Sequence, residues 1–152
     1  MDGEQSCHHY QERGVEIVTA GASDAGVLTR YFTLLDDRRI EDLVDMFAED
    51  GVMITKGGTE GRAVHGRTNL RSYYQGRGPS TVTHVITASS QSPGVSLAEG
   101  IVFPRDADGE QKFFIASASL DQDGRITRYT TLVWPGITVE QATFLVGTAD
   151  GR

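Results

Sequence analysis

Apolar positions along this chain follow two different periods. They recur every three to four residues from Val27 to Leu35 and again from Ile40 to Phe47, which is the spacing of one helix face. The pattern predicts two short helices. Ser23 or Asp24 is suited to cap the start of the first helix, and Gly51 is suited to a C-terminal turn that ends the second.

The next part of the chain is less regular. Residues 52–55 predict a short strand, and the glycine-rich residues 57–66 predict a loop. A third helix is predicted from an N-cap at Thr68 to a stop at residues 76–79, where two glycines and a proline follow one another closely.

From residue 81 onward, apolar and polar residues alternate, which is the period of a half-buried strand. Turns of Asp and Gly separate these segments, and both residue types tolerate the positive φ angles of tight hairpins. The predicted turns are residues 106–109 and 121–124. The predicted strands are residues 81–88, 95–103, 112–120 and 125–134.

Helices first and a meander of strands afterwards predict an α+β domain with its helices on one face of the sheet. A strongly twisted sheet that closes over helices leaves a concave side, where such folds commonly hold a ligand. We expect residues 1–22 to form a loose arm, residues 23–136 the domain, and residues 137–152 a tail with a short helix after a capping box at residues 138–141.

Composition narrows the classes of partner and compartment. The 152-residue chain has 14 basic and 21 acidic side chains and a net charge of −7. Nucleic acids and anionic membranes attract basic faces, so neither is expected as a partner. No stretch approaches the roughly 20 apolar residues of a membrane helix. The single cysteine, Cys7, is compatible with a reducing compartment, and a cytoplasmic protein is expected.

Neither a metal nor a cofactor is expected. Cys7-His8-His9 could chelate a metal, but three adjacent residues in a loose arm seldom make a site. The glycines of residues 57–61 are not followed by the Lys-Ser or Lys-Thr of a phosphate-binding loop.

Several segments between residues 25 and 135 carry a family resemblance. They are residues 30–36, residues 40–50, His65-Gly66-Arg67, Tyr73-Tyr74, residues 121–126 and Trp134. In these segments the chain resembles the nuclear transport factor 2-like superfamily, and within it ketosteroid isomerase and the SnoaL-like polyketide cyclases. The resemblance implies a cone-shaped fold, in which three N-terminal helices pack on a curved antiparallel or mixed sheet and enclose an apolar pocket.

The ketosteroid isomerase pattern is only partly present. The resemblance places the tyrosine of its oxyanion hole at Tyr31, its general base near Thr55 and its second oxyanion-hole acid near Ala116. Threonine cannot shuttle a proton near neutral pH, and alanine cannot donate a hydrogen bond. The steroid isomerase mechanism is therefore not expected.

A second arrangement is retained. The resemblance to scytalone dehydratase and to many SnoaL-like proteins places an aspartate at Asp36 and a histidine at His84. A carboxylate that binds one imidazole nitrogen fixes the tautomer and leaves the other nitrogen free as an acid or base. The other catalytic residues of the dehydratase find no match. We therefore expect His84, Asp36 and Tyr31 to be the catalytic residues.

Alternation along the strands also predicts the pocket walls, with simple core packing as the alternative at each position. Tyr73 and Tyr74 are neighbours on a helix and cannot face the same way, so one of them should line the cavity. The predicted substrate-binding residues are Phe47, Met53, Thr55, Tyr74, Phe114, Ala116, Tyr129, Thr131 and Val133.

Three functions remain open from the sequence. The first is a cofactor-independent acid–base enzyme that cyclises, isomerises or dehydrates a hydrophobic small molecule, such as a polyketide or terpenoid intermediate. The second is a non-catalytic protein that binds such a molecule for resistance or transport. The third is an assembly domain, which a small or filled pocket would favour. Leu132 and Trp134 are expected on the outer sheet face, which often pairs in this superfamily, so a homodimer is expected.

Overall fold

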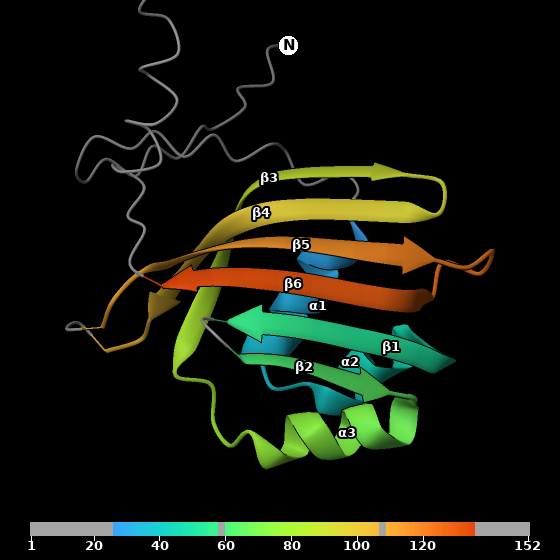
Figure 1. Cartoon of the computed structure of the whole chain (residues 1–152), viewed down its shortest axis with the longest axis horizontal. Helices are drawn as coiled ribbons and strands as arrows, with labels where there is room; N and C mark the ends of the chain where they lie inside the picture. Colours follow the sequence, from blue (N-terminus) through green and yellow to red (C-terminus); the bar gives the residue numbers. More distant parts are fainter. Residues whose placement is uncertain (1–25, 58–59, 107–108, 136–152) are drawn as a thin grey trace, which may run out of the picture.

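The computed structural model describes residues 26–57, 60–106 and 109–135, drawn in colour in Figure 1. The helices are α1 (Val27–Asp36), α2 (Ile40–Asp45) and α3 (Arg67–Gly76). The strands are β1 (Phe47–Gly57), β2 (Glu60–His65), β3 (Val82–Ser92), β4 (Val95–Pro104), β5 (Lys112–Leu120) and β6 (Ile126–Pro135).

The strands form one mixed sheet in the order β2-β1-β6-β5-β4-β3. The pair of β1 and β6 is parallel, and the other neighbouring pairs are antiparallel. In Figure 1 the start of β3 curves down from the far edge of the sheet toward α3. The predicted α+β domain with a mixed, curved sheet is confirmed.

The helices cover the inner face of this sheet. α1 packs against β3, β4 and β5, α3 packs against β1 and β2, and α2 contacts both helices. One side of α1 is exposed at Arg30. The opposite side supplies core residues, namely Leu28, Tyr31, Phe32 and Leu34. The core therefore lies between the helices and the sheet.

The predicted end of the second helix is wrong. α2 ends at Asp45, and residues 47–50 begin β1. Gly51 lies where the register between β1 and β6 shifts, and an added Cβ there would lie 2.8 Å from the carbonyl oxygen of Ile126. The glycine therefore permits a close approach of two strands at a bulge and does not end a helix.

The loop predicted for residues 57–66 is wrong over β2, which pairs with β1 at the edge of the sheet. Of its residues only Val64 is even partly buried, so β2 lacks the apolar alternation that marks a strand. α3 begins at Arg67, directly after Gly66 with φ 78°, so Thr68 is not its N-cap.

The four later strands are confirmed. β5 has the predicted bounds, whereas β3 continues past residue 88 to Ser92. The turn after β5 is also confirmed, since Gly124 has φ 75°. The Asp121 carboxylate accepts the backbone N–H groups of Asp123 and Arg125 at 2.9 and 2.8 Å.

Several predictions lie outside the described residues. They are the arm at residues 1–22, the cap at Ser23 or Asp24, the Cys7-His8-His9 tract and the tail at residues 137–152. Within the described ranges, no helix is long and apolar enough to cross a membrane. The same ranges hold no group of three or more His, Cys, Asp and Glu side chains placed to hold a metal ion.

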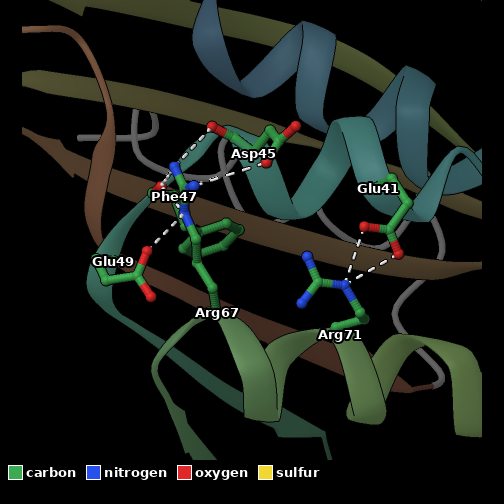
Figure 2. A network of polar contacts seen from close by, with 6 residues as sticks. All are labelled: Glu41, Asp45, Phe47, Glu49, Arg67 and Arg71. Carbon is green, nitrogen blue, oxygen red and sulfur yellow. Dashed lines mark hydrogen bonds and ion pairs between the residues drawn. The ribbon is translucent and has the colours of Figure 1, made fainter.

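Arg67 ties three elements together (Figure 2). From the start of α3, its Nε donates to the carbonyl oxygen of Phe47 at 2.8 Å, and its Nη2 donates to that of Asp45 at 3.3 Å. One turn further along α3, Arg71 Nε pairs with the Glu41 carboxylate on α2 at 2.9 Å. These contacts fix α3 against the end of α2 and the start of β1, and both α3 and β1 contribute to the cavity described below.

Gly100 on β4 leaves no room for a side chain. An added Cβ would lie 2.1 Å from the carbonyl oxygen of Val85 and 2.7 Å from the ring of Phe114. Because strand pairing and the core hold both groups, we expect Gly100→Ala to lower the free energy of unfolding by at least about 1–3 kcal/mol in a denaturant titration. Gly57→Ala is the control, since its added Cβ meets nothing within 4 Å. Similar losses for both variants would contradict this account.

Candidate active site

Asp36 and His84 form a close pair between α1 and β3. Asp36 Oδ1 lies 2.7 Å from His84 Nδ1, and Asp36 Oδ2 accepts the backbone N–H of His84 at 2.7 Å. The carboxylate therefore holds both the strand and the ring of one residue. Because a carboxylate only accepts, it selects the neutral tautomer with the proton on Nδ1 and leaves a lone pair on Nε2.

Aromatic rings surround the imidazole. The ring centroid of Phe32 lies 4.8 Å from that of His84, and the ring of Phe114 meets it edge-on at 5.7 Å. The side chains of His84 and Asp36 are only 14% and 12% exposed. Among the described residues, Nε2 of His84 has no hydrogen-bond partner. The imidazole that carries this free nitrogen is therefore packed beside two aromatic rings and is mostly shielded from solvent.

Arg105 binds the backbone on either side of the Asp36–His84 pair. Its Nη2 donates to the backbone oxygen of Asp36 at 3.0 Å, and its Nε donates to that of Val82 at 3.2 Å. One guanidinium thus links the end of α1 to the start of β3. These are the two elements whose separation sets the distance between Asp36 and His84.

Three buried tyrosines form a second group. The hydroxyls of Tyr31 and Tyr74 lie 2.6 Å apart, and Tyr74 also donates to the sulfur of Met53 at 3.2 Å. The ring of Tyr129 stacks on that of Tyr31 with centroids 4.3 Å apart. When Tyr74 donates to Met53, Tyr31 donates to Tyr74. When Tyr74 donates to Tyr31, the proton of Tyr31 is free for another acceptor.

Burial raises the pKa of Tyr31, Tyr74 and Tyr129 well above the ordinary value for tyrosine. The side-chain hydrogen bonds of Tyr74 with Tyr31 and of Tyr129 with Thr131 act in the opposite direction and lower the pKa in part, and the charge of Arg77 lowers it by a smaller amount. All three hydroxyls stay protonated near neutral pH, so they serve as hydrogen-bond donors and not as bases.

The two groups meet at a cavity of about 90 Å³. Tyr31 and His84 both line it, and Asp36 lies behind His84. Six of the predicted substrate-binding residues are in its wall, namely Met53, Thr55, Phe114, Tyr129, Thr131 and Val133. The other three, Phe47, Tyr74 and Ala116, are buried in the core and are not part of the wall.

Four residues of the wall were not predicted, namely Phe32, Leu35, Tyr73 and Arg77. Phe32 directly follows Tyr31, and both are buried because α1 has a wide buried face. Tyr73, and not Tyr74, is the tyrosine of α3 that lines the cavity. Tyr74 lies one layer deeper, where its hydroxyl contacts the wall residues Tyr31 and Met53. Arg77 carries no signal in the sequence, because a charged residue between two glycines usually faces solvent.

A larger groove of about 660 Å³ lies at the far end of β3 and β4, beside Gly26, Gly94 and Gly124. Two of its polar side chains already have structural partners. Gln91 Oε1 accepts the backbone N–H of Val27 at 2.8 Å, and the Asp121 carboxylate holds its own turn. We therefore place the chemistry at the smaller inner cavity.

Solved structures share this architecture. The fold is similar to an NTF-2 like protein from Burkholderia xenovorans LB400, with a TM-score of 0.59 and 12% identity, covering 74% of this chain and 83% of that one. It is similar to a candidate ketosteroid isomerase from Kribbella flavida DSM 17836, with a TM-score of 0.57 and 18% identity over 70% and 73% of the two chains. A candidate SnoaL-like polyketide cyclase from Shewanella putrefaciens CN-32 gives a TM-score of 0.57 and 13% identity over 80% and 93%.

These identities are low, so the three structures define the fold class and nothing finer: an NTF2-like α+β cone around an internal cavity. The family model of the SnoaL-like domain matches residues 28–129, more than half of the chain. The chain belongs to the SnoaL-like domain family, as its resemblance predicted. A search of curated proteins finds no match.

Proposed function

We propose that this protein is a cofactor-independent acid–base enzyme that acts on a hydrophobic small molecule. The observation that carries the proposal is the Asp36–His84 pair, which opens through His84 onto a cavity that Tyr31 also lines. A base held in one orientation and a hydrogen-bond donor at the same cavity are what proton transfer next to a carbonyl group requires.

The proposed step uses these residues in fixed roles. His84 Nε2 takes a proton from a carbon beside a carbonyl group, and the C–H electron pair moves to form an enolate. The Tyr31 hydroxyl donates a hydrogen bond to the enolate oxygen. The imidazolium, held by Asp36, then returns its proton to one of three places. They are another carbon of the enolate system, the alkoxide formed when the enolate carbon closes a ring on a second carbonyl group, and a hydroxyl group that leaves as water. These outcomes are isomerisation, cyclisation and dehydration.

The size of the cavity limits what enters it. Sites for whole drug-sized ligands have volumes of about 300–1,000 Å³, whereas this cavity has about 90 Å³. We propose that only the reacting end of the substrate enters. The remainder of a natural-product intermediate, such as a polyketide or terpenoid, would lie over Leu35, Tyr73 and Val133 in this arrangement.

Non-catalytic binding is the second candidate, and Thr55 and Ala116 favour it. They occupy the positions where the resemblance placed the acids of the steroid isomerase, and neither can exchange a proton near neutral pH. The small cavity is also what an assembly domain would have. Neither alternative requires a carboxylate that holds an imidazole with a free nitrogen, so the enzyme remains our proposal.

Hydrogen–deuterium exchange tests the proposed function without knowledge of the substrate. The protein is incubated in D₂O with a panel of small enolisable ketones, and NMR follows the loss of their α-proton signals. We expect exchange above the buffer rate for at least one ketone, and the rate should survive exhaustive chelation with EDTA. Exchange at the buffer rate for every ketone would favour the binding protein, and recovery only with added zinc would exclude a metal-independent mechanism.

We also propose a homodimer that pairs through the outer sheet face. Leu132 and Trp134 are on that face, as expected, and are 39% and 36% exposed. Leu132 lies directly opposite Ile115, which is 43% exposed. Light scattering should give twice the chain mass of 16.5 kDa, and Leu132→Glu should shift the protein to the monomer, because it places a charge in the contact. A monomer mass for the wild type at micromolar concentration would contradict the dimer.

A further inference from the structure

The mouth of the cavity carries positive charge on an otherwise acidic chain. Arg77 lines the cavity, and its guanidinium carbon lies 5.7 Å from the ring centroid of Tyr73. The guanidinium carbon of Arg62 lies 5.6 Å from the same centroid. Two like charges therefore gather on one half-buried ring, within the range of cation–π contacts.

Strand pairing explains why Arg62 reaches this place. Arg62 on β2 lies directly opposite Thr55 on β1, and Thr55 is part of the cavity wall. Residues directly opposite each other in an antiparallel pair point to the same face of the sheet. Arg62 therefore shares the inner face with Thr55 and approaches Tyr73 from β2, while Arg77 approaches it from the end of α3.

Neither arginine is neutralised within the described part of the chain. No carboxylate of the described residues lies within 4.0 Å of either guanidinium, whereas Arg39 and Arg71 each pair with one and Arg67 pairs with two. The mouth thus offers planar donors to an anion whose apolar part enters the cavity.

We infer that Arg77, with Arg62 beside it, binds a carboxylate group of the substrate, so that the substrate is a small amphipathic carboxylic acid. The inference rests on the proposed function, because it uses the same cavity. The apolar end of the acid occupies the space beside His84, and its carboxylate stays at the mouth. A cavity of about 90 Å³ has room for such an end.

The position of Arg77 favours a singly charged group over a phosphate. Arg77 is the C-terminal cap residue of α3, and the C-terminal end of a helix carries partial negative charge. Helix N-termini, not C-termini, are the usual partners of phosphate dianions. The planar fork of a guanidinium fits a carboxylate directly.

Calorimetric titration with hexanoate and with hexanamide, its neutral isostere, tests the inference. We expect the wild type to bind hexanoate about 2- to 5-fold more tightly, as for one ion pair at an exposed site. Arg77→Gln should remove most of this preference and lower the affinity for hexanamide much less than that for hexanoate. Arg62→Gln should remove a smaller part of the preference. Arg128→Gln is the matched control, because it makes the same change of charge at an exposed position on β6.

Three results would overturn the inference. The first is equal affinity for hexanoate and hexanamide, which includes no detectable binding of either. The second is a preference for hexanoate that survives Arg77→Gln. The third is tighter binding of hexyl phosphate than of hexanoate. A preference lost equally in Arg128→Gln would show a general effect of net charge and would count against it as well. The titration measures binding and not turnover, so its outcome is independent of the deuterium-exchange test. A protein that binds hexanoate through Arg77 but exchanges no proton would retain this inference and lose the proposed function.

Discussion

His84→Ala should lower the rate of α-proton exchange by about 10²–10⁴-fold, which is the contribution of one positioned acid–base group. The same change should lower the free energy of unfolding by about 1–3 kcal/mol. It leaves one oxygen of the Asp36 carboxylate without its partner and removes the ring that packs against Phe32 and Phe114. The side chain lies at the edge of the cavity and is 14% exposed. Kinetics and a denaturant titration on the same preparation would separate the two effects.

Asp36→Asn should lower the rate for a more specific reason. Asp36 Oδ2 accepts a backbone N–H, and Oδ1 faces Nδ1 of His84. An asparagine that keeps its oxygen on the backbone N–H must turn its NH₂ group toward Nδ1. Nδ1 then becomes the acceptor and Nε2 carries the proton, so the imidazole can no longer act as a base.

The double variant and a matched control complete this experiment. Because the two residues act as a unit, Asp36→Asn combined with His84→Ala should cost little more than His84→Ala alone. His65→Ala is the control, since His65 is exposed on the edge strand β2 and is not part of the cavity wall. Full activity of His84→Ala, or a loss in His65→Ala of the same size, would contradict the proposed roles.

The sequence predicted those elements whose side chains divide cleanly between core and solvent. β5 alternates between buried and exposed positions, and its bounds were predicted correctly. β2 could not be recognised, because an edge strand with two exposed faces has no apolar face to repeat. The start of β1 was mistaken for helix because Phe47 continues the helical spacing of the apolar residues between 40 and 44. Residues 47 and 48 are both buried near the bulge, so they show no strand-like alternation that could have corrected the prediction.

The candidate site was predicted only in part from local sequence patterns. No local pattern joins Asp36 to His84, which are 48 positions apart, and only the family resemblance brought them together. The wall residues on β1, β5 and β6 followed from alternation. Tyr74 was predicted where Tyr73 lines the wall, and Arg77 was missed, because the roles of these residues depend on the angle at which α3 lies against β1. The ties of Arg67 to Phe47 and Asp45 contribute to that angle (Figure 2).

The stability of the protein should fall steeply in alkaline solution. Burial raises the pKa of Tyr31, Tyr74 and Tyr129 in the folded state, whereas an unfolded tyrosine ionises near pH 10. Below about pH 10 both states keep these protons, and the full stability is present. Above it the unfolded state releases protons that the folded state retains, so rising pH favours unfolding. Each tyrosine contributes a slope of about 1.4 kcal/mol per pH unit, or about 4 kcal/mol for the three.

Denaturant titrations at pH 8, 10 and 11 would measure this loss, because a total stability of about 5–15 kcal/mol is consumed within a few pH units at such a slope. Tyr129→Phe provides the internal test. It keeps the buried ring that stacks on Tyr31 and removes one of the three ionisable hydroxyls, so the slope above pH 10 should fall by about one third. The stability of the variant at pH 8 should change much less. A free energy of unfolding that stays constant from pH 8 to pH 11, or an unchanged slope in Tyr129→Phe, would show that the buried hydroxyls do not control alkaline unfolding.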